Sequence, residues 1–309
     1  MAKVVIQECR EYELNGLMKK INDGIERLGG WDLFVHPGDK VLLKVNLIGP
    51  KSSDSAAVTH SEFVRAVARI LKQRGCEVWI GDSSGGAIAG IAPTAKSFRA
   101  AGYEKVAVEE GAVKNVFGCI PGLRKARYHK MAPNPESFGE ILADIHQNAE
   151  FKLHIMDGII AMQGEGPTAG DVCPANKILM STDPLALDTA ALKMLGVEVG
   201  EVAILGAAKE RKIGECKLED IIIDGDYKAI PKLDNFQLPK RYKSGKKRNY
   251  KALIKVIDFF KTAPKVNRKK CRNCNVCVES CPVKAINRDT KQIDYKVCIE
   301  CMCCHELCM

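Results

Sequence analysis

The arrangement of cysteines near the carboxyl end constrains this 309-residue chain more than any other feature of its sequence. Nine of the 14 cysteines lie in the last 39 residues, and eight of these nine repeat one spacing, C-x2-C-x2-C-x3-C. The first copy is Cys271, Cys274, Cys277 and Cys281, and the second is Cys298, Cys301, Cys304 and Cys308. Thiolates at such short intervals lie on tight turns, where they can share one inorganic group.

Two copies of this spacing predict two [4Fe-4S] clusters. Three thiolates of one copy can hold three irons of a cubane, but the fourth iron faces away and takes its ligand from the other copy. We therefore assign Cys271, Cys274, Cys277 and Cys308 to one cluster, and Cys298, Cys301, Cys304 and Cys281 to the other. Zinc is the alternative, because paired C-x2-C units also bind it, but zinc explains neither the third C-x2-C step nor an exchanged fourth ligand.

The cysteine-rich tail resembles the bacterial two-cluster ferredoxin domain. Pro282 follows the first copy, as in that family, and the run from Val283 to Val297 fits a turn and a short hairpin. The tail departs from the family in two ways, since Met309 stands where a second proline is expected and Cys303 is an additional cysteine. Neither departure removes a ligand. The resemblance implies a small α+β domain that carries electrons.

The five other cysteines are scattered singly through the preceding sequence, which argues against a disulfide framework. We expect them to be small buried hydrophobic residues rather than reactive thiols. They are Cys9, Cys76, Cys119, Cys173 and Cys216.

Length and composition indicate two domains. A chain of 33.9 kDa with 46% hydrophobic residues can bury a sizeable core, and it is long for one average domain. No signal-peptide pattern opens the sequence and no apolar run approaches the roughly 20 residues that span a bilayer. We therefore expect a cytoplasmic protein without a membrane span.

A basic segment separates the two predicted domains. Between Pro239 and Lys270 the chain has 13 Lys or Arg residues and a single acidic residue, Asp258. Apolar residues at helical spacing predict a helix from Tyr250 to Phe260, so we interpret the segment as a linker with one helix. A nucleic-acid patch is the alternative, but no aromatic ladder or recognised motif accompanies the charge, and we do not expect nucleic acid as a partner.

The first part of the chain alternates strand-like and helix-like stretches. Strands are predicted at Val4 to Ile6, Lys40 to Leu47 and Glu77 to Gly81, and helices at Leu14 to Leu28 and Ser61 to Arg74. This order predicts an α/β domain with a mostly parallel sheet, in which ligands collect beyond the carboxyl ends of the strands.

Polar residues follow those predicted strands. Lys44 and Asn46 lie near the end of the second strand, and Asp82 directly follows the third. Two roles are predicted for Asp82, either an N-cap of the next turn or a ligand for metal or substrate. The glycine-rich run from Gly81 to Gly90 matches neither common nucleotide-binding pattern, so we interpret it as a tight turn. Lys114 and Asn115 can hold an anionic or carbonyl oxygen, or else belong to a turn with a solvated lysine.

A later stretch combines a rigid loop with carboxylates. Gly164 and Gly166 belong to a loop that runs to Gly170 and whose backbone can approach a ligand closely. Asp157 and Asp188 flank this loop in the sequence and suit a hard cation, a substrate ammonium group or proton transfer.

The third carboxylate of this stretch, Asp183, can equally be an N-cap before Pro184. Asp188 is the stronger candidate, because it follows Leu187 at the start of a run of small and apolar residues to Leu195, where a buried carboxylate needs a partner.

Several short sequence motifs of the chain together resemble those of the iron-sulfur family catalogued as domain of unknown function 362. They are Gly-Ala-Val-Lys-Asn-Val-Phe-Gly at 111–118, Gly-Glu-Gly-Pro-Thr-Ala-Gly at 164–170, Asp-Pro-Leu-Ala-Leu-Asp at 183–188, and the shorter Lys44 to Asn46, Thr59-His60 and Gly81 to Ser83. In that family a further strand-rich stretch precedes the lysine-asparagine pair, whereas here the pair closely follows Gly102-Tyr103. We therefore expect a central sheet that lacks strands, either in a shortened member with an altered ligand site or after loss of an internal segment.

We predict an α/β domain at 1–238, a basic linker at 239–270 and a ferredoxin-like domain at 271–309. Three functions fit this organisation. The first is an oxidoreductase component, with a redox partner protein and a small-molecule ligand bound at the α/β candidates named above. The second is a non-catalytic ferredoxin whose large domain docks a partner enzyme. The third is a redox-sensing protein that binds nucleic acid through the basic linker.

Overall fold

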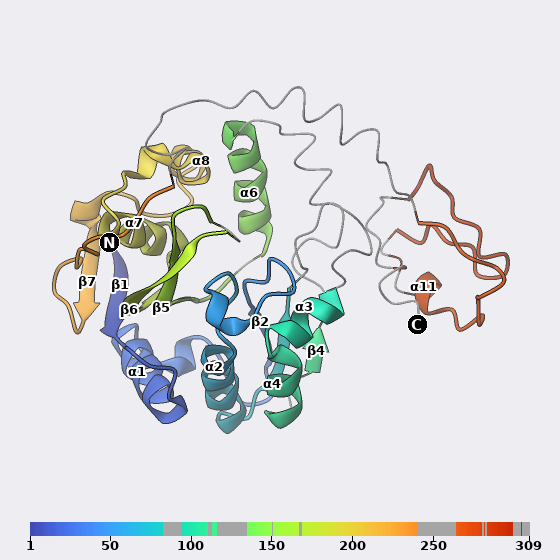
Figure 1. Ribbon diagram of the computed structural model, residues 1–309, viewed down its shortest axis with the longest axis horizontal. Helices are drawn as coiled ribbons and strands as arrows, with labels where there is room; N and C mark the ends of the chain where they lie inside the picture. The colour runs from blue at the N-terminus through green and yellow to red at the C-terminus, as the bar shows by residue number, and fades with distance from the viewer. Residues whose placement is uncertain are drawn as a thin grey trace.

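The α/β part of the chain contains two separate sheets in this computed structural model (Figure 1). The structure describes residues 1–82, 94–110, 113–115, 135–149, 151–166, 169–239, 264–279, 281, 283–298 and 304.

The larger sheet is mixed and has four strands in the order β5-β6-β1-β7. They are β1 (Ala2–Glu8), β5 (His154–Gln163), β6 (Asp171–Ser181) and β7 (Ile221–Gly225). β1 pairs antiparallel with β6 and parallel with β7, and β5 pairs antiparallel with β6. Val4, Val5 and Ile6 are fully buried, because helices cover both faces of this central strand.

The smaller sheet is parallel and has three strands in the order β2-β3-β4. They are β2 (Lys40–Lys44), β3 (Glu77–Gly81) and β4 (Val113–Asn115). Lys44 and Asn115 lie in register with Gly81 on either side of it, so the three strands end side by side. The carboxyl ends of the strands therefore form one edge, where polar residues follow β2 and β3.

The predicted α/β class is confirmed, but the prediction of one mostly parallel sheet is wrong. β1 does not join β2 and β3; it pairs with β6 and β7, which are far away in the sequence. The predicted strand at Glu77 to Gly81 agrees with β3. The strand predicted to reach Leu47 ends at Lys44, because Val45 to Leu47 turn to bond with the segment around Thr59 and with Asp82.

The helices begin where their caps predict. His60 accepts the Glu62 N–H at the start of α2, and Asp183 accepts the Ala186 N–H at the start of α7, with Pro184 in the first turn. The helices are α1 (Leu14–Arg27), α2 (Ser61–Gln73), α3 (Thr94–Ala100), α4 (Tyr103–Glu109), α6 (Pro135–Ala149), α7 (Pro184–Met194), α8 (Ala203–Glu210) and α11 (Val276–Glu279). Short 3-10 helices occur at Trp31–Leu33, Ser53–Ser55, Val199–Glu201 and Leu218–Asp220.

Two hydrophobic clusters hold the layers together. One side of the larger sheet packs on α7 through Ile6, Leu179 and Ala190. The other side joins α1 and α2 in a core that includes Val5 and Met180 and continues beneath the smaller sheet. Burial of apolar surface in these clusters fixes how the two sheets are placed, and so where the space between them lies.

The described carboxyl-terminal segment, 264–298, contains α11 and an isolated antiparallel bridge between Ile286 and Ile293. The predicted helix at Tyr250 to Phe260 lies outside the described residues, as do Cys301, Cys303 and Cys308. Among the helices that the structure describes, none is both long and apolar enough to cross a membrane.

Candidate functional site

A cavity of about 1010 Å³ lies between the two sheets. Its walls come from β2 with its flanking loops, the start of β5, α2, the end of α6 and the start of α7. Most of the lining side chains are apolar, among them Phe34, Leu43, Phe63 and Ile155. Ligand pockets typically measure about 300–1,000 Å³ and have mainly apolar walls with a few polar groups, so this hollow has the size and lining of a binding site.

The cavity runs along the free edges of two strands. β2 bonds only to β3, and β5 bonds only to β6, so each is an edge strand among the described residues. Every residue from Asp39 to Asn46 lines the cavity, and so does every residue from Phe151 to Asp157. Successive side chains of a strand point to opposite faces, so a cavity that contacts them all borders the edge of the strand.

Polar residues collect where β2 and β3 end. The Lys44 ammonium group donates to Asp82 Oδ2 at 3.0 Å, and the Leu47 N–H donates to the same oxygen at 2.9 Å. Asp82 is buried, and these two hydrogen bonds connect it, at the end of β3, to the residues at and after the end of β2. Asn46 lines the cavity and donates to the Ala57 carbonyl at 3.2 Å. Of these candidates, Lys44 and Asn46 face the cavity.

Lys114 and Asn115 lie on β4 rather than on a turn. Asn115 is in register with Gly81, directly before Asp82, which brings the backbone of this pair to the same polar edge. Their side chains lie outside the described residues, and their role in binding an oxygen stays a prediction.

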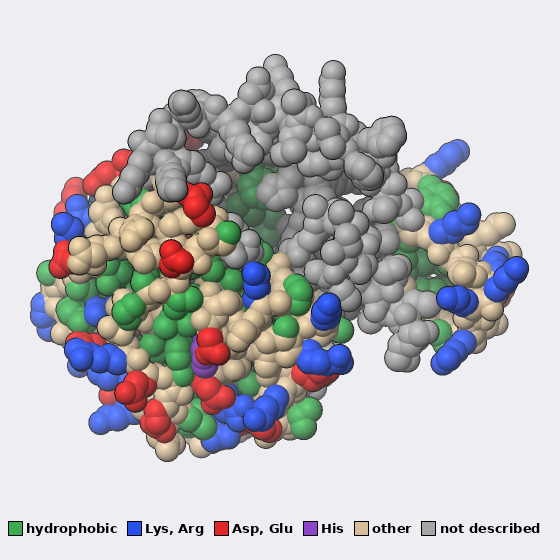
Figure 2. Space-filling view, in the orientation of Figure 1, with side chains coloured by type: hydrophobic (Ala, Val, Ile, Leu, Met, Phe, Trp, Pro, Cys, Tyr) green, Lys and Arg blue, Asp and Glu red, His purple; other side chains and the backbone are tan. Residues whose placement is uncertain are grey.

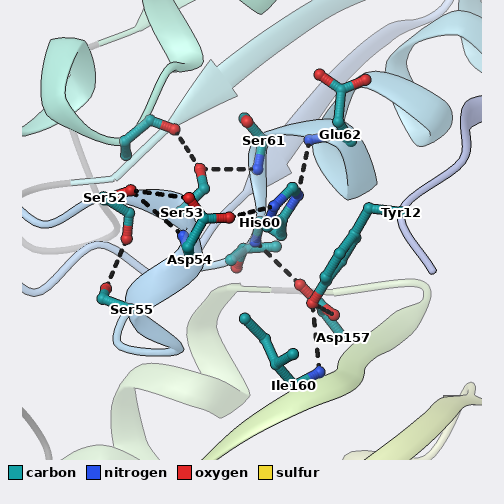
Figure 3. A network of polar contacts seen from close by, with 12 residues as sticks. Tyr12, Ser52, Ser53, Asp54, Ser55, His60, Ser61, Glu62, Asp157 and Ile160 are labelled. Carbon is teal, nitrogen blue, oxygen red and sulfur yellow. Dashed lines mark hydrogen bonds and ion pairs between the residues drawn. The ribbon is translucent and has the colours of Figure 1, made fainter. Parts of the chain in front are cut away.

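Asp157 is the best-connected carboxylate of the cavity wall (Figure 3). Its Oδ1 accepts from the Tyr12 hydroxyl at 2.8 Å, and its Oδ2 accepts from the His60 N–H at 2.9 Å. Burial raises the pKa of this carboxyl, and the two hydrogen bonds oppose that increase. Asp157 thus ties β5 to the loops before α1 and α2, with both oxygens in use.

The imidazole of His60 is held in one tautomer. Its Nδ1 accepts the Glu62 N–H at 3.2 Å, so a neutral ring carries its proton on Nε2, which lies 3.3 Å from Asp54 Oδ1. Tyr12 stacks on this ring with centroids 3.6 Å apart and planes 13° from parallel (Figure 3). These contacts hold Asp157, which lines the cavity, in a fixed position.

The hydrogen bond from the Tyr12 hydroxyl to Asp157 can be tested directly. We expect Tyr12→Phe to lower the free energy of unfolding by about 1 kcal/mol, because Asp157 loses one donor while its carboxylate stays partly buried. Chemical denaturation followed by tryptophan fluorescence measures the change. Tyr295→Phe is the matched control, since its hydroxyl bonds to Pro264 in the carboxyl-terminal segment. An equal loss in both variants would contradict a special role for the Tyr12–Asp157 bond.

Asp188 differs from Asp157 because it has no hydrogen-bond or ion-pair partner among the described residues. It lies one turn into α7, is partly buried and lines the cavity beside Leu187. Burial alone raises its pKa to about 6. The carboxyl can therefore gain or lose a proton near neutral pH, or accept a hydrogen bond from a ligand.

Three aromatic rings of the cavity wall were missed by sequence reasoning. His146 at the end of α6, Phe151 and His154 at the start of β5 have ring centroids 5.5 to 5.7 Å apart, and all three line the cavity. Burial, with a smaller effect of His146, lowers the pKa of His154 to about 4, so this ring is neutral at pH 7. Its Nε2 is buried without a hydrogen-bond partner among the described residues.

The predicted glycine loop lies away from the described lining of the cavity. It forms the hairpin between β5 and β6, where Gly164 has φ +73° and donates to the Gln237 carbonyl at 2.7 Å. Gly166 donates to Gly164 at 2.9 Å within the same turn. Asp183 acts as the N-cap of α7 and also accepts the Glu215 N–H at 2.8 Å. These contacts show a turn and a helix cap, and a role of Gly164 and Gly166 in ligand binding stays a prediction.

Within the described ranges, no three Cys, His, Asp or Glu side chains form a group that could hold a metal ion. Asp157 and Asp188 both line the cavity, but they do not form such a site with Asp183.

The isolated cysteines behave as small core or half-buried residues. Cys76 is buried, and Cys9, Cys173 and Cys216 are partly buried; Cys119 lies outside the described residues. Burial raises the pKa of Cys9, Cys76 and Cys173, which disfavours the reactive thiolate.

Six cysteines of the tail lie among the described residues. They are Cys271, Cys274, Cys277, Cys281, Cys298 and Cys304. Asn273 and Asn275 have positive φ between the first ligands, so the backbone turns sharply there. The Ala285 N–H donates to Cys281 Sγ at 3.2 Å. Sharp turns of this kind suit closely spaced cysteine ligands.

Comparison with known sequences identifies the class of this tail. The profile of the 4Fe-4S binding domain matches residues 264–287, which include the first cysteine copy. The chain is therefore an iron-sulfur protein of the electron-transfer type. It belongs to the family described as Domain of unknown function (DUF362), whose profile matches residues 41–112 and 110–193, and the resemblance inferred from the motifs is confirmed.

One curated relative is the thylakoid-associated protein sll1697 of Synechocystis sp.. The two sequences are 27% identical over 282 residues, which cover 77% of this chain and 88% of the relative. No solved structure shows significant similarity to the chain.

Proposed function

We propose that this protein is a component of an oxidoreductase, in which two [4Fe-4S] clusters exchange electrons with a reaction at the cavity of the α/β part. The twin cysteine spacing carries the proposal, because it supplies the eight thiolates that two cubanes need. The second copy lies beyond the matched residues 264–287, so the second cluster is part of the proposal.

The number and spacing of the cysteines match the ligands that two clusters need. Cys271, Cys274 and Cys277 supply three thiolates of the first cluster, and Cys298, Cys301 and Cys304 supply three of the second. Cys281 and Cys308 complete the set by exchange between the clusters. A cluster supplies single-electron transfer at a potential that hydrogen bonds and charge adjust, and the Ala285 N–H on Cys281 is one such hydrogen bond.

The cavity supports a reaction site in the α/β part. A binding module needs complementary surface only, whereas this hollow holds an unpartnered carboxyl with a raised pKa and a neutral buried imidazole. Perturbed groups of this kind gather at catalytic sites, where they move protons. Asp188 is the residue we assign to proton transfer, and Lys44 and Asn46 are assigned to ligand contacts.

A docking function is the second candidate, favoured by the charge of the tail. Figure 2 shows Lys and Arg side chains across the visible face of 264–298. The exposed basic residues include Lys265, Arg268, Lys269, Lys270, Arg272, Lys284, Arg288 and Lys296, against Glu279, Asp289 and Asp294. Such a face suits a redox partner protein with an acidic surface, and its association would weaken with salt.

Metal analysis tests the cofactor. We expect anaerobically purified protein to contain about eight irons and eight sulfides per chain, because each cubane has four of each. After reduction, EPR should show two interacting paramagnetic clusters. Stoichiometric zinc with little sulfide would contradict the proposal. Oxidation of the reduced clusters by a small-molecule substrate would favour the oxidoreductase, and a stable complex with a redox protein would favour docking.

A further inference from the structure

The cavity has a specific chemical character. Among the lysines of its wall, Lys44 pairs with Asp82 and Lys40 lies 4.0 Å from Glu77, while Lys152 is exposed. His154 is neutral, and Asp188 carries the only unpartnered carboxyl we find on the described wall. Such a wall suits a ligand body that is uncharged and largely apolar, with hydrogen-bonding groups along one side.

The free edge of β2 supplies matching hydrogen-bonding groups. Asp39 and Val45 bond to β3 through their backbone, and strand residues alternate, so Lys40, Leu42 and Lys44 point their N–H and C=O groups the other way. These groups have no hydrogen-bond partner among the described residues. They form an alternating row of donors and acceptors along the cavity.

Aromatic and aliphatic side chains supply the apolar part of the cavity lining. Phe151, His146 and His154 form a group of aromatic rings in the lining, and Leu43 and Ile155 line the walls between the strands. A planar heteroaromatic ring satisfies both features, because its polar edge can bond to a strand edge while its faces pack on apolar and aromatic side chains.

We propose that this cavity binds the isoalloxazine ring of a flavin. The pyrimidine side of that ring alternates acceptors with one N–H donor, which matches the row on β2, and the dimethylbenzene side is apolar. The inference rests on the proposed electron-transfer function, because a flavin exchanges single electrons with a cluster and electron pairs with an organic substrate. Asp188 lines the same cavity, and its carboxyl can accept a hydrogen bond from the N5–H of the reduced ring.

Binding of free flavins tests the site in the full chain. Anaerobically purified protein of measured iron content is titrated into riboflavin and, separately, into FMN, and binding is followed by equilibrium dialysis and by quenching of flavin fluorescence. We expect saturable binding of one flavin per chain, with the two affinities within about tenfold of each other, because ring contacts dominate and the lysines are mostly paired. Acid extraction of freshly purified protein should also release flavin.

Matched substitutions locate the binding. Ile155→Phe fills the cavity and should weaken binding at least about tenfold, while Ile222→Phe on β7, outside the described lining, should leave it unchanged. Leu43→Phe repeats the test from the opposite wall in case Ile155→Phe does not fold. Equal effects of Ile155→Phe and Ile222→Phe would overturn the assignment, and so would displacement of the flavin by AMP, which would indicate a general nucleotide site.

The two proposals fail separately. Protein that holds its full iron but shows no saturable flavin binding overturns the flavin site and leaves the electron-transfer function standing. Protein without iron or sulfide overturns the function, while dialysis still measures flavin binding directly.

Discussion

Cys281→Ala should damage the cluster built on Cys298, Cys301 and Cys304 and spare the cluster built on Cys271, Cys274 and Cys277. The reason is geometric, because the fourth thiolate of each copy points toward the neighbouring cluster. Cys308→Ala should have the reciprocal effect. In each variant we expect loss of up to about four of the eight irons, measured by iron analysis and by EPR of the oxidised and reduced states.

Double substitutions separate exchanged ligation from ligation within one copy. Cys281→Ala combined with Cys298→Ala should keep one intact cluster, since both changes affect the same site. Cys281→Ala combined with Cys274→Ala should lose both clusters. Ligation within each copy predicts the opposite pair of results. Cys303→Ala is the control and should keep all the iron.

Local sequence signals were sufficient for several elements. β3 could be located because the apolar run from Glu77 to Gly81 is bounded by Gly75 and by polar residues, and α7 could be located because Asp183 and Pro184 mark its start. The cysteine ligands are equally local, since three thiolates of each cluster lie within seven residues. Spacing alone therefore indicates their chemistry.

Pairing between distant strands could not be predicted in the same way. Val4 to Ile6 are β-branched and apolar, which indicates a buried strand, but the pattern does not say that the partner is Leu179 and its neighbours. The apparent β-α-β-α-β order suggested one parallel sheet. Instead, β6 and β7 pair with the two edges of β1, so β1 belongs to a mixed sheet. β2 then lies at the edge of a second sheet.

The candidate site shows the same limit. Asp157 and Asp188 could be singled out, because a carboxylate in an apolar stretch is unusual in any context. His146, Phe151 and His154 carry no such local signal, and they meet only because the end of α6 packs against the start of β5. Tyr12 was missed for a related reason, since its partner Asp157 is 145 residues away in the sequence.

Asp188→Asn should make the protein more stable near pH 7 and at the same time impair its function. The pKa of Asp188 is raised to about 6 from its ordinary value of 3.8, so the folded state binds this proton more tightly than the unfolded chain does. Stability therefore falls as pH rises from about 4 to 6 and stays lower above 6, by about 3 kcal/mol for a shift of this size. Asparagine carries no charge and avoids that cost. Its own unpaired amide reduces the gain in stability by about 1 kcal/mol.

The measurement is thermal unfolding of both proteins between pH 4.5 and 7.5. The wild-type protein should lose stability across this range relative to Asp188→Asn, and the gap should close at the acid end. Asp183→Asn is the comparison variant, because that carboxylate bonds to two backbone N–H groups and its loss should destabilise α7. A destabilised Asp188→Asn protein would show that the carboxyl is structural. An unpaired carboxyl in a cavity lowers stability, and the protein gains from it only when a ligand or a proton binds there. Asp188 is therefore assigned to function if Asp188→Asn is more stable, binds flavin more weakly and keeps its iron content.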